Sequence, residues 1–203
     1  MTAARLLCAD LVGRRCRDDR GAQLVEFAVT LPLMMVFVVG IFDFSGAFTL
    51  KQKLTNATRD AARAAAAEPA TDLSQPLPTS VNDAFQAVKN YLATNHINDC
   101  GITTPVSSPG LKWKSTANGN GCVAPGLTLI INRGYYFPQS GTGALPSVNC
   151  VPQAPGGQTA VIGTCVSIQY PYPWRFGRVA SLLGSAVALP FQISATAVAM
   201  NEN

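Results

Sequence analysis

Residues 21–50 read GAQLVEFAVTLPLMMVFVVGIFDFSGAFTL, and this stretch decides what kind of protein the chain forms. Its only acidic residues are Glu26 and Asp43, and no basic residue follows before Lys51. A helix of about 20 mainly apolar residues crosses the hydrocarbon core of a bilayer, at about 1.5 Å per residue. The stretch therefore predicts one membrane-spanning helix. After Glu68, Pro, Gly and polar residues interrupt every apolar run, so we expect a single span.

The helical pattern continues beyond the apolar stretch. Apolar residues recur there at helical spacing while polar residues occupy the other sides. These apolar positions are Leu50, Leu54, Ala57, Ala61 and Ala64. Residues 61–67 favour a helix and Pro69 ends it, so a helix from about residue 23 to 68 would be about 65–70 Å long. Its face of small residues packs either against a partner helix or against the chain's own domain.

The first 21 residues form a short basic arm. It contains Arg5, Arg14, Arg15, Arg17 and Arg20 against Asp10, Asp18 and Asp19. Such an arm normally stays in the cytoplasm. Four basic residues after the span nearly balance it, namely Lys51, Lys53, Arg59 and Arg63. Charge alone therefore leaves the orientation of the span open.

Cysteine usage favours one orientation. Four cysteines fall in a Gly/Pro-rich region, namely Cys100, Cys122, Cys150 and Cys165. An even set of this kind predicts two disulfides in an oxidising compartment, with three possible connectivities, of which Cys100–Cys122 and Cys150–Cys165 are the local pairs. A zinc site is disfavoured because the set contains no C-x-x-C pair and the only histidine is His96. We expect the region after the span to lie outside the cytoplasm.

Residues 69–203 predict a small domain that begins with a helix. A linker from Pro69 to Pro78 precedes it, and Ser80 is the expected N-cap, with Asp83 in a capping-box-like position. The apolar stripe of this helix consists of Val81, Ala84, Phe85, Val88, Tyr91 and Leu92. Such a stripe is typical of a helix that packs on a domain core.

Short β-type runs separated by turns follow, and they predict a small antiparallel sheet. The runs are Leu111 to Lys114, Leu127 to Ile131, Cys165 to Tyr170 and Ala186 to Met200. In the last run Ile193 and Ala195 alternate with polar residues, as in a strand with one buried face. The predicted fold class is α+β: a long N-terminal membrane-spanning helix that continues into a small extracytoplasmic domain with an antiparallel sheet.

The start of the apolar stretch carries a further motif. Gly21 is followed by Ala22-Gln23-Leu24-Val25-Glu26-Phe27, so a glycine precedes the helix and a carboxylate lies five residues beyond it. This resembles the cleavage motif of type IV prepilins. The longer pattern is Arg20 to Ala28, Leu31-Pro32-Leu33, Gly40-Ile41-Phe42-Asp43-Phe44 and Ala61-Ala62-Arg63, and with it residues 20–65 resemble the TadE-like family, pseudopilins of the tight-adherence (Flp pilus) system.

The resemblance implies processing and assembly. A prepilin peptidase would cut after Gly21, so mature protein would begin at Ala22. The expected parts are then residues 1–21, a basic cytoplasmic leader that is removed; residues 22–68, a transmembrane and extended pilin-like helix; and residues 69–203, a disulfide-linked extracytoplasmic α+β domain. The implied partners are the peptidase, other pilins or pseudopilins, an inner-membrane assembly platform and membrane lipid. The implied location is the bacterial inner membrane, with a periplasmic C-terminal domain that enters a surface pilus or stays in the membrane.

Glu26 and Asp43 are the candidates for charge pairing during assembly. A carboxylate near the membrane boundary needs a partner or water, and cleavage would create an amine at Ala22, about one helical turn from Glu26. The alternative is a shallow carboxylate at the headgroup level. Asp43 either contacts a polar neighbour or lies at the outer interface. The 17-residue gap sets the two carboxylates about 100° apart around the helix, so we expect two separate contacts.

The loop Tyr170-Pro171-Tyr172-Pro173-Trp174-Arg175-Phe176 is the candidate for partner contact. Aromatic and arginine side chains are enriched at interaction hot spots, which selects Tyr172, Trp174, Arg175 and Phe176. The alternative is packing within the domain or contact with the membrane interface.

Enzymatic activity is not expected. After Glu68 the acids are Asp72, Asp83, Asp99 and Glu202, and no G-x-S-x-G, H-E-x-x-H or phosphate-loop motif occurs. Neither a cofactor nor a metal site is predicted, and no dense basic patch favours nucleic-acid binding. Two functions remain: a minor pilin or pseudopilin, and an uncleaved single-pass anchored protein whose outer domain binds a ligand.

Overall fold

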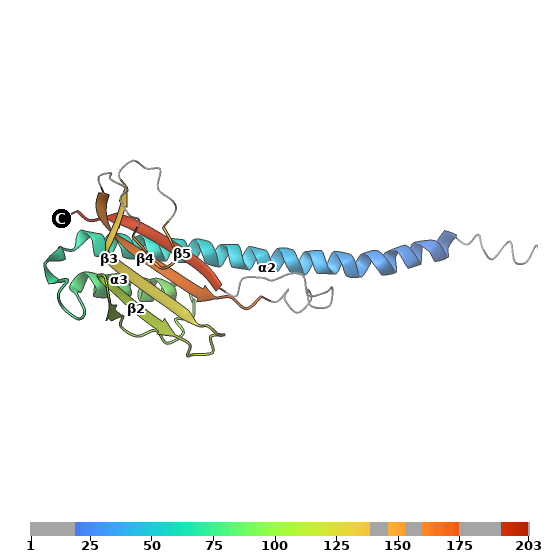
Figure 1. Ribbon diagram of the computed structural model, residues 1–203. Coiled ribbons are helices and arrows are strands. Elements are labelled where there is room, and N and C mark those ends of the chain that lie inside the picture. The colour runs from blue at the N-terminus through green and yellow to red at the C-terminus, as the bar shows by residue number, and fades with distance from the viewer. Residues whose placement is uncertain (1–18, 139–145, 153–159, 175–191, 203) are drawn as a thin grey trace, which may run out of the picture. The chain divides into compact units, whose positions relative to one another are not determined.

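The computed structural model describes residues 19–138, 146–152, 160–174 and 192–202 (Figure 1). The chain divides into two compact units, with the boundary between Phe44 and Ser45. The predicted α+β class is confirmed, because a long apolar N-terminal helix is followed by a second helix and a five-stranded antiparallel sheet.

Helix α2 runs over Asp19–Ala67 and contains Pro32. It begins about four residues earlier than the sequence predicted and ends two residues before Pro69, as expected. In the first unit most of its apolar side chains are exposed. They include Leu24, Phe27, Met34, Phe37, Phe42 and Phe44. Among the residues that the structure describes, this helix alone is long and apolar enough to cross a membrane, judged by length and composition.

The second unit contains one sheet with the strand order β1-β2-β3-β4-β5, in which each strand pairs antiparallel with the next. The strands are β1 Val106–Ser108, β2 Lys112–Ala117, β3 Leu127–Pro138, β4 Ala160–Pro171 and β5 Gln192–Met200. Strand β1 was not predicted, because three residues are too short for an alternating pattern to show. Strands β3 and β4 are longer than predicted. The start of the predicted last strand, residues 186–191, lies outside the described residues.

Helix α3 runs over Thr79–Thr94, and its predicted N-cap is wrong. The residue before the helix is Pro78, which makes no side-chain cap. Ser80 lies inside the first turn, fully buried, where its hydroxyl has no hydrogen-bond partner among the described residues. The cap comes instead from Asp72, whose Oδ2 accepts a hydrogen bond from the Thr79 amide at 2.6 Å. Asp72 ends the short helix η1, Ala70–Asp72, which brings the carboxylate back to the helix start.

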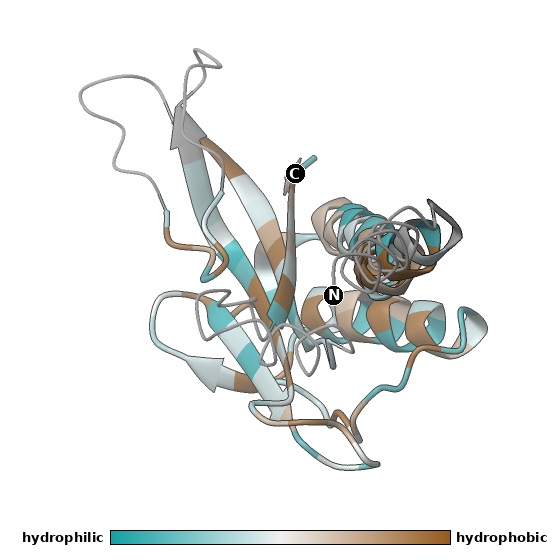
Figure 2. Ribbon diagram, turned by 90° about the vertical axis from the view of Figure 1, so that its right-hand side faces the viewer, coloured by the Kyte–Doolittle hydropathy of each residue, from teal (hydrophilic) through white to brown (hydrophobic). Residues whose placement is uncertain are grey.

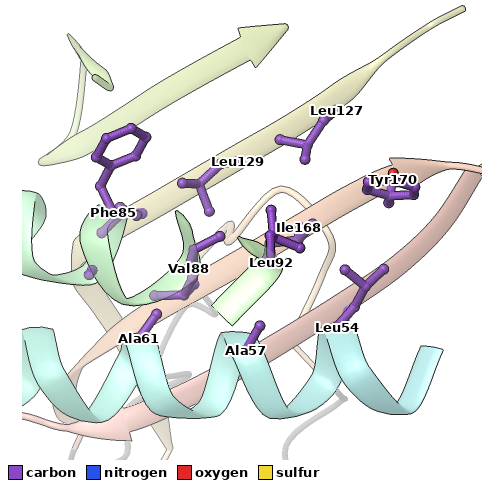
Figure 3. Close-up of a cluster of buried hydrophobic side chains, with 14 of the residues drawn as sticks. Leu54, Ala57, Ala61, Phe85, Val88, Leu92, Leu127, Leu129, Ile168 and Tyr170 are labelled. Atoms are coloured by element: carbon purple, nitrogen blue, oxygen red, sulfur yellow. The ribbon is translucent and has the colours of Figure 1, made fainter. Parts of the chain in front are cut away.

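Both helices of the second unit cover the same face of the sheet (Figure 2). The core combines Leu54, Ala57 and Ala61 of α2, the apolar stripe of α3, and inward residues of β2 to β5 (Figure 3). Ala57 and Ala61 are fully buried against Val88, Leu92 and Ile168 in this core. The small-residue face of α2 therefore packs within its own domain, which is one of the two alternatives that the sequence left open. Ala65, rather than the predicted Ala64, continues the buried row.

Candidate functional site

The predicted processing segment lies in the first turns of α2. Gly21 is exposed, and a Cβ atom added to it would meet no other atom within 4 Å. Ala22 follows within the same helical turn. Glu26 is exposed, and the four-residue spacing sets it on the same side of the helix as Ala22, one turn further on. The role of Gly21 and Ala22 in processing stays a prediction.

The second predicted carboxylate is in a different environment. Asp43 is only 6% exposed, whereas Glu26 belongs to the exposed part of the helix. A buried carboxylate is held inside its own chain, because charge removed from water needs compensating contacts. Of the two candidates for pairing with another subunit, Glu26 is therefore the accessible one. The assembly role of both residues stays a prediction.

Sequence reasoning missed Arg133, which joins the end of α2 to the sheet. It stands in β3 at an irregularity of the strand pairing between Asn132 and Tyr135, and it is 1% exposed. Its Nη1 donates to the Ala65 carbonyl and to Thr164 Oγ1, the latter at 2.8 Å, and its Nη2 donates to the Glu68 carbonyl at 2.8 Å. The last carbonyls of a helix have no partner within the helix, so the guanidinium satisfies groups that would otherwise be buried and unpaired.

The electrostatics of Arg133 follow from its burial. Loss of water lowers the pKa of its guanidinium, and the nearby charges of Asp72 and Glu68 oppose this effect. A cation at the C-terminus of a helix is also favoured by the helix dipole. The sequence signal that could have pointed to this attachment is the lone arginine in a mainly apolar strand, because a buried charge needs several hydrogen-bond acceptors. The sequence does not say where those acceptors are.

The two predicted disulfides are confirmed in the C-terminal domain, and the structure pairs Cys100 with Cys122 and Cys150 with Cys165. Cys150 lies on the sheet face away from the helices, in a small buried cluster with Ile130, Tyr135 and Cys165. Asn132 of β3 also holds the segment around Cys150, since its side-chain amide donates to the Cys150 carbonyl at 2.8 Å. The segment that holds Cys150 is thereby fixed to β3 and β4.

The first disulfide lies near a buried tyrosine. The Tyr170 hydroxyl donates to the carbonyl oxygen of Asn98 at 2.9 Å, two residues before Cys100. Burial raises the pKa of Tyr170, and the negative charge of Asp99 raises it further. The end of β4 is thus tied to the segment that follows α3.

Two of the four residues predicted to contact a partner can be placed. Tyr172 and Trp174 are half-buried, pack against the core, and contact each other edge to face with ring centroids 4.8 Å apart. A Cβ atom on Gly46 of α2 would lie 2.8 Å from the Tyr172 hydroxyl oxygen. Arg175 and Phe176 lie outside the described residues. A role of this loop in partner binding stays a prediction.

Within the described ranges, no group of three or more His, Cys, Asp or Glu side chains is placed to hold a metal ion. The described residues show an exposed apolar helix whose C-terminal part packs in a disulfide-linked sheet domain.

Comparison with known proteins identifies the N-terminal part. The model of the family described as TadE-like protein matches residues 21–63. The matched part contains the predicted processing segment and the apolar half of α2, and it ends within α2, before α3 and the strands of the sheet. The comparisons found no similar curated protein and no similar solved structure.

Proposed function

We propose that this chain, which carries a TadE-like segment at residues 21–63, is a minor pilin or pseudopilin of a tight-adherence (Flp type IVb) pilus assembly or secretion system. It acts as a structural or assembly component rather than as an enzyme. The observation that carries the proposal is the exposed apolar helix whose accessible start holds Gly21 and Glu26. An exposed apolar helix of this length needs lipid or other helices around it.

The proposed location is the bacterial inner membrane, with one span and a periplasmic C-terminal domain. Two disulfides support this orientation, because they persist in an oxidising compartment. The basic arm before the span then lies in the cytoplasm, where positively charged flanks are enriched. After assembly the domain stays at the membrane or enters a surface pilus.

A prepilin peptidase removes the leader, residues 1–21, in this proposal. Cleavage after Gly21 releases the amine of Ala22, which pairs with Glu26 of the same or a neighbouring subunit. The mature helix then packs with other pilins or pseudopilins and with the inner-membrane assembly platform. Exposure of both Gly21 and Glu26 supports this sequence of events.

Intact mass of the membrane-extracted protein tests the proposal. We expect wild-type protein to lack residues 1–21, and the variant Gly21→Leu to keep them. The structure makes this variant informative, because a side chain at position 21 meets open space and the helix itself tolerates it. Ala28→Leu is the matched control, since Ala28 is also exposed on α2, and it should be processed normally.

A full-length mass for the wild-type protein would favour the other function, an uncleaved single-pass anchored protein whose outer domain binds a ligand. Processing of Gly21→Leu at the wild-type position would contradict the role of Gly21. Co-purification with other pilins then separates an assembly component from a processed protein that acts alone.

A further inference from the structure

The tip at the end of β4, Pro171 to Trp174, combines aromatic side chains with a fixed position along α2. Tyr172 and Trp174 form an edge-to-face pair, and the exposed Pro173 lies between them. The amide of Trp174 donates to the Tyr172 carbonyl at 3.1 Å, so the chain turns tightly here. This turn holds both rings at one end of the sheet.

The contact between Tyr172 and Gly46 sets the level of this tip along the helix. The Tyr172 hydroxyl lies so close to Gly46 that a Cβ atom there would be only 2.8 Å from it. Gly46 still belongs to the apolar stretch, which extends to Leu50. The tip therefore lies beside the last apolar turns of α2 and not beside its polar continuation.

The depth of Gly46 in a membrane follows from the helical rise. Glu26 is the last ionisable group at one end of the apolar stretch, and Gly46 lies 20 residues beyond it. At about 1.5 Å per residue this is about 30 Å, the thickness of the hydrocarbon core. Gly46 is thus expected at the outer boundary between acyl chains and headgroups. The exposed Lys51 and the half-buried Lys53 follow at the level of the headgroups.

Tyr and Trp are the residues enriched at this boundary, because each combines an apolar ring with a polar group. Phe48, which is 64% exposed, adds an aromatic ring at the same level of α2. The aromatic rings of the tip and of Phe48 therefore lie at the level of α2 where a bilayer surface favours them.

We infer that the tip Pro171 to Trp174 is a second membrane contact, which rests in the headgroup region of the phospholipid bilayer beside α2. This inference relies on the proposed membrane anchoring by α2. The tip adds to that anchoring by holding the sheet domain against the bilayer surface before the subunit is extracted into an assembly. A single helix with nothing else at the interface would leave the domain free to rotate and tilt.

Fluorescence quenching by lipids tests the inference, because the chain has only two tryptophans. Trp113 is 1% exposed in the core of the sheet domain and serves as an internal reference. Full-length protein is reconstituted into vesicles of phosphatidylcholine and phosphatidylglycerol whose acyl chains carry bromine near the headgroup or near the chain end. We expect wild-type emission to fall more with the shallow quencher than with the deep one. In Trp174→Phe we expect neither quencher to reduce emission.

A third variant separates failure of this inference from failure of the anchoring itself. Phe37→Trp in the Trp174→Phe background places a reporter in the apolar half of α2, and we expect the deep quencher to reduce its emission. If this reporter is quenched while wild-type protein and Trp174→Phe respond equally, the helix spans the bilayer and the tip does not touch it, which overturns the inference. If the reporter is not quenched, the anchoring fails and the inference fails with it.

Discussion

Arg133 of β3 donates a hydrogen bond from its Nη1 to the carbonyl oxygen of Ala65, in the last turn of α2. The two residues are 68 positions apart in the chain. The same guanidinium donates to the Glu68 carbonyl just beyond the helix, so one side chain holds the end of α2 against the sheet.

Replacement of Arg133 by Met should destabilise the domain strongly. Hydrogen bonds to a charged group contribute about 1.5–3 kcal/mol each, and the variant leaves several acceptors buried and unpaired, so we expect a loss of roughly 3 kcal/mol or more. Urea unfolding of the full chain in detergent, followed by near-ultraviolet circular dichroism, measures this. Arg59→Met is the matched control, because Arg59 is exposed on α2 and should change stability by no more than about 0.5 kcal/mol. Equal midpoints for the two variants would contradict the anchoring role.

The small-residue face of α2 gives a second prediction. Ala61 is fully buried against the core, so Ala61→Leu should overpack it and lower the free energy of unfolding by about 1–3 kcal/mol. Ala67→Leu adds the same side chain at an exposed position of the same helix and should be nearly neutral. The same unfolding measurement compares them. If Ala61→Leu is as stable as wild type but fails to assemble, this face packs against a partner helix instead.

The pairing of the cysteines is checked by peptide mapping of non-reduced protein. We expect one cross-linked peptide with Cys100 and Cys122, and another with Cys150 and Cys165. Replacing Cys150 and Cys165 by Ser should lower stability by about 3 kcal/mol, the chain-entropy value for a loop of about 15 residues. Crossed pairs, or four free thiols in protein from the periplasm, would refute this arrangement.

Glu26→Ala should separate insertion from assembly. Glu26 is exposed in the structure, so the fold should not change, and removal of a charge from the span makes insertion more favourable. Docking beside neighbouring helices should suffer, because the Ala22 amine loses its partner. We expect at least tenfold less assembled protein, which corresponds to about 1.4 kcal/mol, at unchanged amounts of processed protein. Gln23→Ala is the exposed control one turn earlier. Wild-type assembly by Glu26→Ala would make Glu26 a shallow interfacial carboxylate.

Tyr170 should make the domain sensitive to alkaline pH. Its pKa in the folded state is raised by burial and by Asp99, whereas in the unfolded chain it is about 10. The hydroxyl therefore loses its proton at a higher pH in the folded state than in the unfolded chain. The stability that the protonated Tyr170 contributes is complete below about pH 10, and it is lost as the pH rises through the higher folded pKa. Unfolding free energies measured between pH 8 and pH 11 should fall less steeply for Tyr170→Phe than for wild type. If the unfolding free energies of the two proteins fall equally with pH, Tyr170 does not contribute to the alkaline loss of stability.

The sequence by itself determined the features that depend on near neighbours. The apolar stretch predicted the exposed half of α2, Pro69 predicted its end, and the alternation around Ile193 and Ala195 predicted a strand with one buried face. These signals are local, because the residues that define a helix face or a strand face lie only two to four positions apart. An even set of cysteines likewise predicted two disulfides without the fold.

Only the tertiary structure decided which distant groups meet. Arg133 finds acceptors 65 and 68 positions away, and Asp72, not Ser80, caps α3. The small face of α2 turned out to pack within its own domain. In each case the sequence shows a group that needs a partner, but several partners would satisfy the same chemistry. The choice among them depends on how the turns and the sheet bring remote segments together, because the buried backbone carbonyls at the end of α2 need donors from outside the helix.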